Sequence, residues 1–230
     1  MPWRAAAPCA PNAVADHAAL LDALRRILGP GFGVGACDPR TASDPLWDAE
    51  RPAMARAVPK RVLEFAAGRT AARAAMTDIG LKPAAIPMGA DRAPIWPDGM
   101  IGSIAHCNSV AIAALAPAGT AGSIGIDIEE NTPLPRDLWD TICTPRELGW
   151  LATQPDDQHA TLAKHIFTAK EAIYKAQYPL TGQMIGFEDV DITLTETGFT
   201  ARLADRRATG TTTVLRGLII AQLCFTDIGG

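Results

Sequence analysis

Residues 123–130, SIGIDIEE, place two acidic side chains two positions apart at the end of an apolar run. Side chains alternate between the faces of a strand, so the three isoleucines share one face. Gly125, Asp127 and Glu129 share the other. Along a strand the two acids lie about 6.5–7 Å apart, close enough to converge on one cation, with Gly125 leaving room for a ligand. The alternative interpretation is an ordinary strand whose acidic end is solvated.

The rest of the chain predicts an α+β protein built of two similar halves. Helical periodicity and antiparallel strand patterns recur on both sides of a break at residues 117–122, PAGTAG. We therefore expect an N-terminal half over residues 1–120 and a C-terminal half over residues 121–230. Helices are expected at residues 16–28, 60–76, 145–152 and 158–177, an extended loop at 83–100, and an antiparallel meander at 187–225.

Composition limits the choice of function. The net charge of the 230 residues is -4, which provides no overall attraction to nucleic acid or acidic membranes. No apolar run is long enough to span a bilayer, and the N-terminus lacks a signal-type apolar core. The five cysteines are widely spaced and include no C-x-x-C pair. These features predict a cytoplasmic protein that binds neither nucleic acid nor membranes.

A second constellation lies in residues 164–177, KHIFTAKEAIYKAQ. At 100° per residue, Glu171, Tyr174 and Lys175 lie opposite the apolar stripe, with Lys170 at its margin. Glu171 and Lys175 could form only a surface pair one turn apart. A third carboxylate beside Asp127 would instead complete an oxygen-rich Mg²⁺ site, and the lysines would suit a phosphate ligand.

The first half contributes basic residues. Arg69 and Arg73 fall near the apolar stripe of their helix, where each needs an anionic ligand or an internal partner such as Glu64 or Asp78. Arg92 lies in the irregular loop. His106 ends a predicted strand, where a lone histidine is most often structural. A nucleophile pair of Ser103 or Cys107 with His106 lacks the G-x-S-x-G elbow and is disfavoured.

The order of these motifs is that of a known family. GIDIEE, followed about 40 residues later by FTAKEAIYKA, resembles the paired signature of the 4'-phosphopantetheinyl transferases. The upstream EFAAGRTAAR, PMGADRAPIWPDGMIGSIAHC and AIAAL are similar to the Sfp-type branch, most of all to the enterobactin synthetase component D group. The resemblance covers roughly residues 60–178. The chain reads SIAH where the family commonly has SISH, which removes one hydroxyl at Ala105.

The resemblance implies a pseudo-twofold pair of α+β halves, each with a small antiparallel sheet packed on a long helix, around a coenzyme A cleft. Such an enzyme transfers phosphopantetheine from coenzyme A to a serine of an acyl or peptidyl carrier protein, and adenosine 3',5'-bisphosphate leaves. The implied metal is Mg²⁺, with Mn²⁺ as the alternative, and a monomer is expected. The implied metal ligands are Asp127, Glu129 and Glu171; the catalytic residues are Glu171, Lys175 and Asp127; the coenzyme A contacts are Arg69, Arg73, Arg92, Ser103, His106, Lys170 and Lys175.

Two other functions remain compatible with the sequence. The same three acids could serve a Mg²⁺-dependent phosphohydrolase acting on a nucleotide or pyrophosphate, which would need no carrier protein. A non-catalytic nucleotide-binding or carrier-binding module is the third interpretation. The segment after Glu129 contains Leu134, Leu138 and Trp139, which could form an apolar docking surface for a carrier or part of the core.

Overall fold

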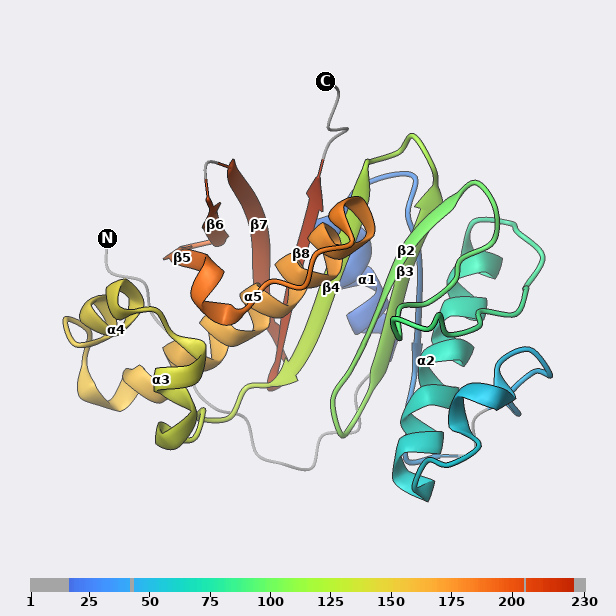
Figure 1. Ribbon diagram of the computed structural model, residues 1–230, viewed down its shortest axis with the longest axis horizontal. Helices are drawn as coiled ribbons and strands as arrows, with labels where there is room; N and C mark the ends of the chain where they lie inside the picture. The colour runs from blue at the N-terminus through green and yellow to red at the C-terminus, as the bar shows by residue number, and fades with distance from the viewer. Residues whose placement is uncertain (1–16, 42–43, 205, 226–230) are drawn as a thin grey trace.

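The computed structural model describes residues 17–41, 44–204 and 206–225, and their strands form two antiparallel sheets (Figure 1). The first sheet has the order β1-β3-β2 and the second β4-β8-β7-β6-β5. The first contains β1 (Gly33–Cys37), β2 (Met100–His106) and β3 (Ala111–Pro117); the second contains β4 (Ser123–Glu130), β5 (Val190–Thr195), β6 (Gly198–Leu203), β7 (Arg206–Leu215) and β8 (Leu218–Phe225). The predicted α+β class and the predicted C-terminal meander are confirmed.

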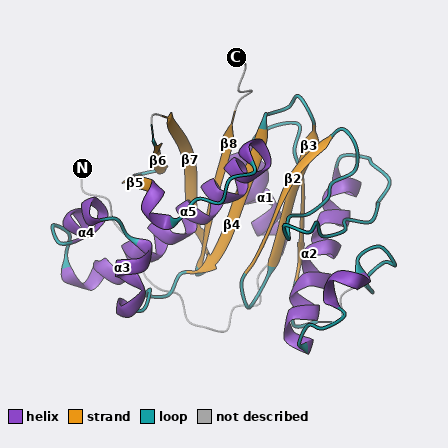
Figure 2. Cartoon of the chain, viewed as in Figure 1, coloured by secondary structure: helices purple, strands orange, loops and turns teal. Residues whose placement is uncertain are grey.

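One long helix accompanies each sheet, as Figure 2 shows. α2 packs on the first sheet and α5 on the second. The helices are α1 (His17–Leu28), α2 (Pro59–Asp78), α3 (Trp139–Ile142), α4 (Pro145–Leu151) and α5 (His159–Thr181), with short 3-10 turns η1 (Arg51–Met54), η2 (Arg136–Leu138), η3 (Asp156–Gln158) and η4 (Phe187–Asp189). None of the described helices is both long and apolar enough to cross a membrane.

Glycine lets each long helix touch its sheet through the main chain. A Cβ at Gly125 would lie 1.8 Å from the carbonyl oxygen of Ala172 in α5, and one at Gly35 would lie 2.0 Å from that of Ala71 in α2. The same contact recurs in each half, as expected of two similar halves. The expectation that Gly125 makes room for a ligand is wrong, because the main chain of α5 fills that space.

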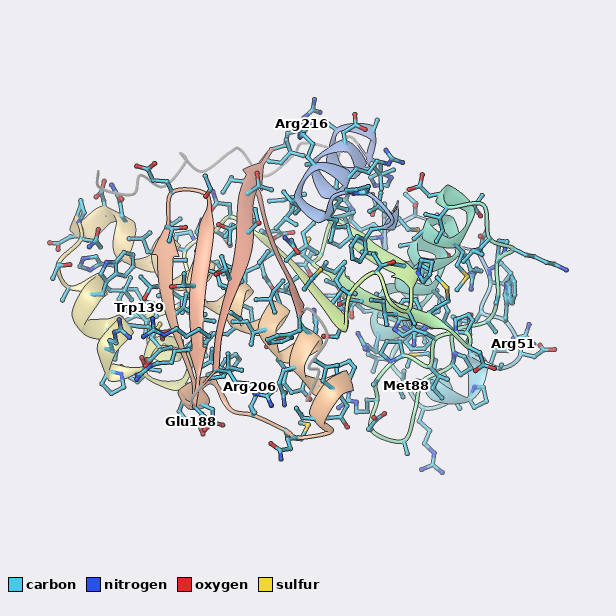
Figure 3. All side chains as sticks on the ribbon, turned by 90° about the horizontal axis from the view of Figure 1, so that it is seen from above. Arg51, Met88, Trp139, Glu188, Arg206 and Arg216 are labelled. Atoms are coloured by element: carbon cyan, nitrogen blue, oxygen red, sulfur yellow. The ribbon has the colours of Figure 1, made fainter. Side chains whose placement is uncertain are left out.

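The two halves share a core beneath α1. Leu20 and Leu24 of α1 cluster with Ile112 of β3 and with Ile126 and Ile128 of β4. Seen from above, α1 and α5 lie on opposite faces of the second sheet (Figure 3). This agrees with the predicted alternation of β4, whose isoleucine face is buried. The division of the chain at residue 120 stays a prediction, since this cluster includes both sheets.

The segment after β4 belongs mainly to the core. Leu134 and Trp139 are buried in the cluster that contains α5, and Trp139 Nε1 donates a hydrogen bond to the carbonyl of Leu134 (3.0 Å). Leu138, by contrast, is 41% exposed. Two of the three residues considered for an apolar docking surface are therefore core residues.

Candidate active site

A pocket of about 780 Å³ is lined by residues of both halves. Its first wall comes from α2, the following loop and β2, and its second from β4 and α5. The first wall includes Arg61, Glu64, Phe65, Gly68, Arg69, Arg92, Trp96, Ser103 and His106; the second includes Asp127, Glu129, Phe167, Glu171, Tyr174, Lys175 and Tyr178. Eight of the predicted site residues thus line one cavity: Arg69, Arg92, Ser103, His106, Asp127, Glu129, Glu171 and Lys175.

The three predicted acids lie near one another in this pocket. Burial raises the pKa of Glu171, Lys175 lowers it, and the charges of Asp127 and Glu129 raise it. Burial also raises the pKa of Glu129; a hydrogen bond from Lys164 lowers it, and the charge of Asp127 raises it. These effects on the pKa of Glu171 show that the three carboxylates are close enough to repel one another. Strand alternation in β4 and helical spacing in α5 therefore direct them toward the same place.

Two lysines of α5 engage the acids of β4. Lys175 Nζ lies 2.7 Å from Asp127 Oδ1, and Lys164 Nζ lies 2.5 Å from Glu129 Oε2. The second oxygen of Asp127, Oδ2, is buried and has no hydrogen-bond partner among the described residues. A buried carboxylate oxygen without a partner is costly, which points to a cation or donor supplied by a ligand.

The donor set suits a hard divalent cation, although the side chains are not converged on one. Within residues 17–41, 44–204 and 206–225, no three His, Cys, Asp or Glu side chains stand close enough together to hold a metal ion. Two of the three acids are instead paired with lysines. Carboxylate oxygens are the ligands that Mg²⁺ and Mn²⁺ prefer, and the orphaned Asp127 Oδ2 fits such an ion.

Arg69 lies in the opposite wall. Its Nε donates to the carbonyl of Ile86 (2.8 Å), and its guanidinium lies 3.8 Å from the ring centroid of Phe65. Burial lowers the pKa of Arg69 to about 10, so the side chain is still a cation at neutral pH. These contacts fix the guanidinium plane in the pocket wall, where it can receive an anionic ligand.

Arg61 is a pocket residue that the sequence reasoning missed. Its Nη1 lies 2.9 Å from Nε2 of His106. A guanidinium has only donors, so Nε2 accepts and His106 is neutral with its proton on Nδ1. Burial lowers the pKa of His106, in keeping with the neutral form. Arg61, Phe65 and Arg69 follow at four-residue intervals, which is the signal that could have found Arg61.

Tyr174 and Tyr178 extend the second wall. They follow Glu171 by three and seven residues, so they lie on the same side of α5 as Glu171. Their ring centroids are 5.7 Å apart. The Tyr178 hydroxyl donates to Oδ2 of Asp91 in the opposite wall (3.1 Å). Beside Asp91, Arg92 has a φ of 71°, a left-handed backbone conformation that is uncommon outside glycine.

Ser103 and Cys107 do not form a nucleophile pair with His106. The Ser103 hydroxyl accepts a hydrogen bond from the amide of Ile126. Cys107 is buried beside Ser109, and burial raises the pKa of its thiol. A raised thiol pKa disfavours the reactive thiolate, so neither residue has the surroundings of a nucleophile.

Two predicted coenzyme A contacts lie outside the pocket wall. Arg73 Nη1 lies 2.9 Å from Oε1 of the fully buried Glu50. Its ion-pair partner is therefore Glu50, and not Glu64 or Asp78 as the sequence suggested. Lys170 Nζ lies 2.8 Å from Oε2 of Glu147 and donates to the carbonyls of Ile142 and Phe187. These internal carboxylates correct the expectation that Arg73 and Lys170 face a phosphate.

Lys170 instead borders a smaller cavity of about 240 Å³, which it shares with Glu171, Tyr174 and Phe187. Its ammonium is held by Glu147 and two carbonyls, so its donors are directed into the protein. Glu50 and Glu147 play matching parts in the two halves, because each also accepts hydrogen bonds from two main-chain amides.

Comparison with known proteins finds two family matches, one in each half of the chain. The N-terminal domain of 4'-phosphopantetheinyl transferases matches residues 49–116, and the 4'-phosphopantetheinyl transferase superfamily matches residues 123–221. The chain is 43% identical to 4'-phosphopantetheinyl transferase Svp of Streptomyces mobaraensis, over 69% of this chain and 65% of that protein. It is 41% identical to 4'-phosphopantetheinyl transferase PptT of Mycobacterium tuberculosis, over 68% of this chain and 70% of that protein.

Similarity to the enterobactin synthase component D proteins is lower. The Escherichia coli K12 protein is 38% identical over 65% of this chain and 69% of its own length. The matched region covers 65% of Svp and 64% of Npt from Nocardia iowensis, slightly less than two thirds of either protein. The motif order, the two matched regions and these relatives establish that the chain belongs to the 4'-phosphopantetheinyl transferase superfamily.

Proposed function

We propose that this protein transfers the 4'-phosphopantetheine arm of coenzyme A to a serine hydroxyl of an acyl or peptidyl carrier protein. The observation that supports this most is the composition of the pocket of about 780 Å³. One wall presents Arg61 and Arg69, and the other presents Asp127, Glu171 and Lys175. Cations facing a group of carboxylates suit a nucleotide phosphate at one end and, at the other, a pyrophosphate whose charge a bound cation would neutralise.

The cation in this proposal is Mg²⁺, with Mn²⁺ as the alternative. Asp127, Glu129 and Glu171 would hold it. When bound, it would neutralise negative charge on the pyrophosphate and on the leaving group. Its fit is supported by the unpartnered Oδ2 of Asp127 and by the repulsion among the three carboxylates.

The protein's own groups would carry out the transfer. The serine oxygen would attack the phosphorus that bears pantetheine, while the bond to the bridging oxygen of the pyrophosphate breaks. Glu171 would take the hydroxyl proton, and adenosine 3',5'-bisphosphate would leave with the bonding electrons. Lys175 would turn from Asp127 to the departing phosphate, and Arg61, Arg69 and Arg92 would bind the nucleotide phosphates.

Ser103 and His106 have supporting parts in this proposal. His106 would hold Arg61 in the pocket wall through its Nε2, and Ser103 would fix β2 beside β4. We include a cytoplasmic monomer in the proposal, because one chain supplies both walls and coenzyme A is a cytoplasmic reactant. Arg73 and Lys170 are assigned to the packing of α2 and α5.

The test is the mass of the carrier. The full chain is incubated with coenzyme A, MgCl₂ and several apo carrier proteins, and each carrier is weighed by intact-protein mass spectrometry. Gain of one phosphopantetheine arm is expected, and Glu171→Gln should abolish it while exposed Glu196→Gln retains it. Coenzyme A cleavage without any modified carrier would support a phosphohydrolase instead. Coenzyme A binding without either reaction would support a non-catalytic module.

A further inference from the structure

We propose that Lys164 is an internal counter-ion of Glu129 that competes with the divalent cation for this carboxylate. The inference rests on the proposed function, because it concerns the cation site assigned there. Its consequence is that the site binds the cation more weakly than three unpaired carboxylates would. Lys164 is thus a positioning residue that sets cation affinity without touching the substrate.

The contact between the two residues is close and shielded. Lys164 Nζ lies 2.5 Å from Glu129 Oε2, and the side chains are only 14% and 24% exposed. The ammonium also lies 5.2 Å from the ring centroid of Phe167, which covers it on one side. Ion pairs that are shielded from water interact more strongly than the exposed pairs of most protein surfaces.

Helical spacing explains why Lys164 reaches the site. It precedes Glu171 by seven residues, and Lys175 follows Glu171 by four. All three side chains therefore lie on the side of α5 that faces β4. The main-chain contact of α5 with Gly125 keeps this face close to the strand. Lys164 is consequently part of the same constellation as the predicted acids, although it precedes the FTAKEAIYKA motif.

The two lysines differ in what else they can reach. Lys175 lines the large pocket, so an anionic ligand there can attract it away from Asp127. Lys164 is not among the residues that line either cavity, and its ammonium is directed at Glu129. A phosphate in the pocket can therefore recruit Lys175 but not Lys164. The cation therefore competes with Lys164 for Glu129.

Removing the Lys164 charge should strengthen cation binding. In Lys164→Met the side chain keeps its apolar stem, while Glu129 becomes available to the ion. We expect Mn²⁺ to bind roughly tenfold more tightly, the order of effect of one added charge at a partly shielded site. Lys164→Arg keeps the counter-ion and should retain the wild-type affinity.

The experiment measures equilibrium binding of Mn²⁺ alone to the full chain, from the electron paramagnetic resonance signal of the unbound ion. Wild type, Lys164→Met, Lys164→Arg and exposed Lys82→Met are compared, with circular dichroism as the check of folding. Glu129→Gln is added to the wild type and to Lys164→Met. We expect it to weaken binding in both backgrounds, and by at least about threefold more in Lys164→Met, where no ammonium competes for Glu129.

Unchanged or weaker binding in a folded Lys164→Met protein would overturn the inference. So would an equal effect of Glu129→Gln in both backgrounds, because the two residues would then be uncoupled. Absence of Mn²⁺ binding from every variant would overturn it as well. The carrier mass assay is separate from these outcomes: transfer with an unaltered Lys164→Met affinity leaves the proposed function intact, whereas absence of transfer contradicts that function alone.

Discussion

The hydroxyl of Ser103 in β2 accepts a hydrogen bond of 3.1 Å from the buried main-chain amide of Ile126 in β4. The two strands belong to different sheets, so this contact joins the sheets at their seam. Ser103→Ala would leave the amide without its partner and should lower the free energy of unfolding by about 1–3 kcal/mol. Urea denaturation measures the change. The control is Ser109→Ala, because the Ser109 hydroxyl lies 3.4 Å from the Cys107 thiol in a turn and its loss should have a smaller effect.

Gly125→Ala should be among the most damaging small substitutions in the chain. The added Cβ would lie 1.8 Å from the carbonyl oxygen of Ala172, so α5 must move away from β4. We expect a loss of roughly 3 kcal/mol or more, together with loss of transfer activity. Gly149→Ala in α4 meets nothing within 4 Å and should stabilise the protein by about 0.5–1 kcal/mol. The melting temperatures of the two variants, measured by thermal unfolding, test this expectation. Similar melting temperatures would contradict the close contact between Gly125 and α5.

His165 should make the protein less stable in acid. Burial lowers the pKa of this histidine from 6.5 to about 4. The unfolded chain therefore binds the proton more readily than the folded one. The contribution of neutral His165 to the free energy of unfolding is complete above pH 6.5 and is lost as the pH falls toward 4. The total is roughly 3 kcal/mol. In His165→Gln, urea denaturation between pH 4.5 and 7 should show a flatter dependence on pH. A slope equal to that of the wild type would exclude His165 as its source.

Lys170 and Lys175 should respond differently to the same substitution. Lys170→Met leaves the buried Glu147 without its cation, and we expect a loss of about 3–5 kcal/mol of stability. Adding Glu147→Gln should recover part of that loss. Lys175→Met should change stability less and weaken coenzyme A binding more, because Lys175 lines the pocket. Denaturation and calorimetric titration with coenzyme A separate the two effects. Weakened binding by a folded Lys170→Met protein would restore its role as a phosphate contact.

Arg61 should contribute to coenzyme A affinity. Hydrogen bonds to charged groups are worth about 1.5–3 kcal/mol, so Arg61→Gln should raise the dissociation constant at least tenfold. The loss should shrink at high salt, because the interaction is between charges. Arg56→Gln, on the exposed turn before α2, is the matched control and should bind as the wild type does. Equal affinities of the two variants would remove Arg61 from the proposed site.

Local periodicity was sufficient to predict the acidic side of the site. Alternation in β4 placed Asp127 and Glu129 on one face, and helical spacing placed Glu171 beside Lys175. These relations depend only on the geometry of one element. The same geometry indicated two packed α+β halves, because the helical and strand patterns recur on either side of residue 120.

The partners of the buried cations could not be predicted in this way. Glu50 precedes Arg73 by 23 residues and reaches it from the segment before η1, and Glu147 reaches Lys170 from α4. A helical wheel separates Arg61 and Arg73 into faces, but it does not say which face meets the pocket. The main chain of α5 against Gly125 is likewise a contact between distant segments. Such relations require the folded chain.

α1 lies on the face of the second sheet opposite α5, and its leucines share a hydrophobic cluster with Ala105 of β2 and Ile126 of β4. Leu20 and Leu24 belong to a cluster with buried residues of both sheets, although no described residue of α1 lines the pocket. Side chains that line no part of the pocket therefore share a core with the two strands that contribute to its walls. We expect the shortening of either leucine to loosen the packing of β2 against β4, so residues on the far side of the sheets also matter to the shape of the pocket.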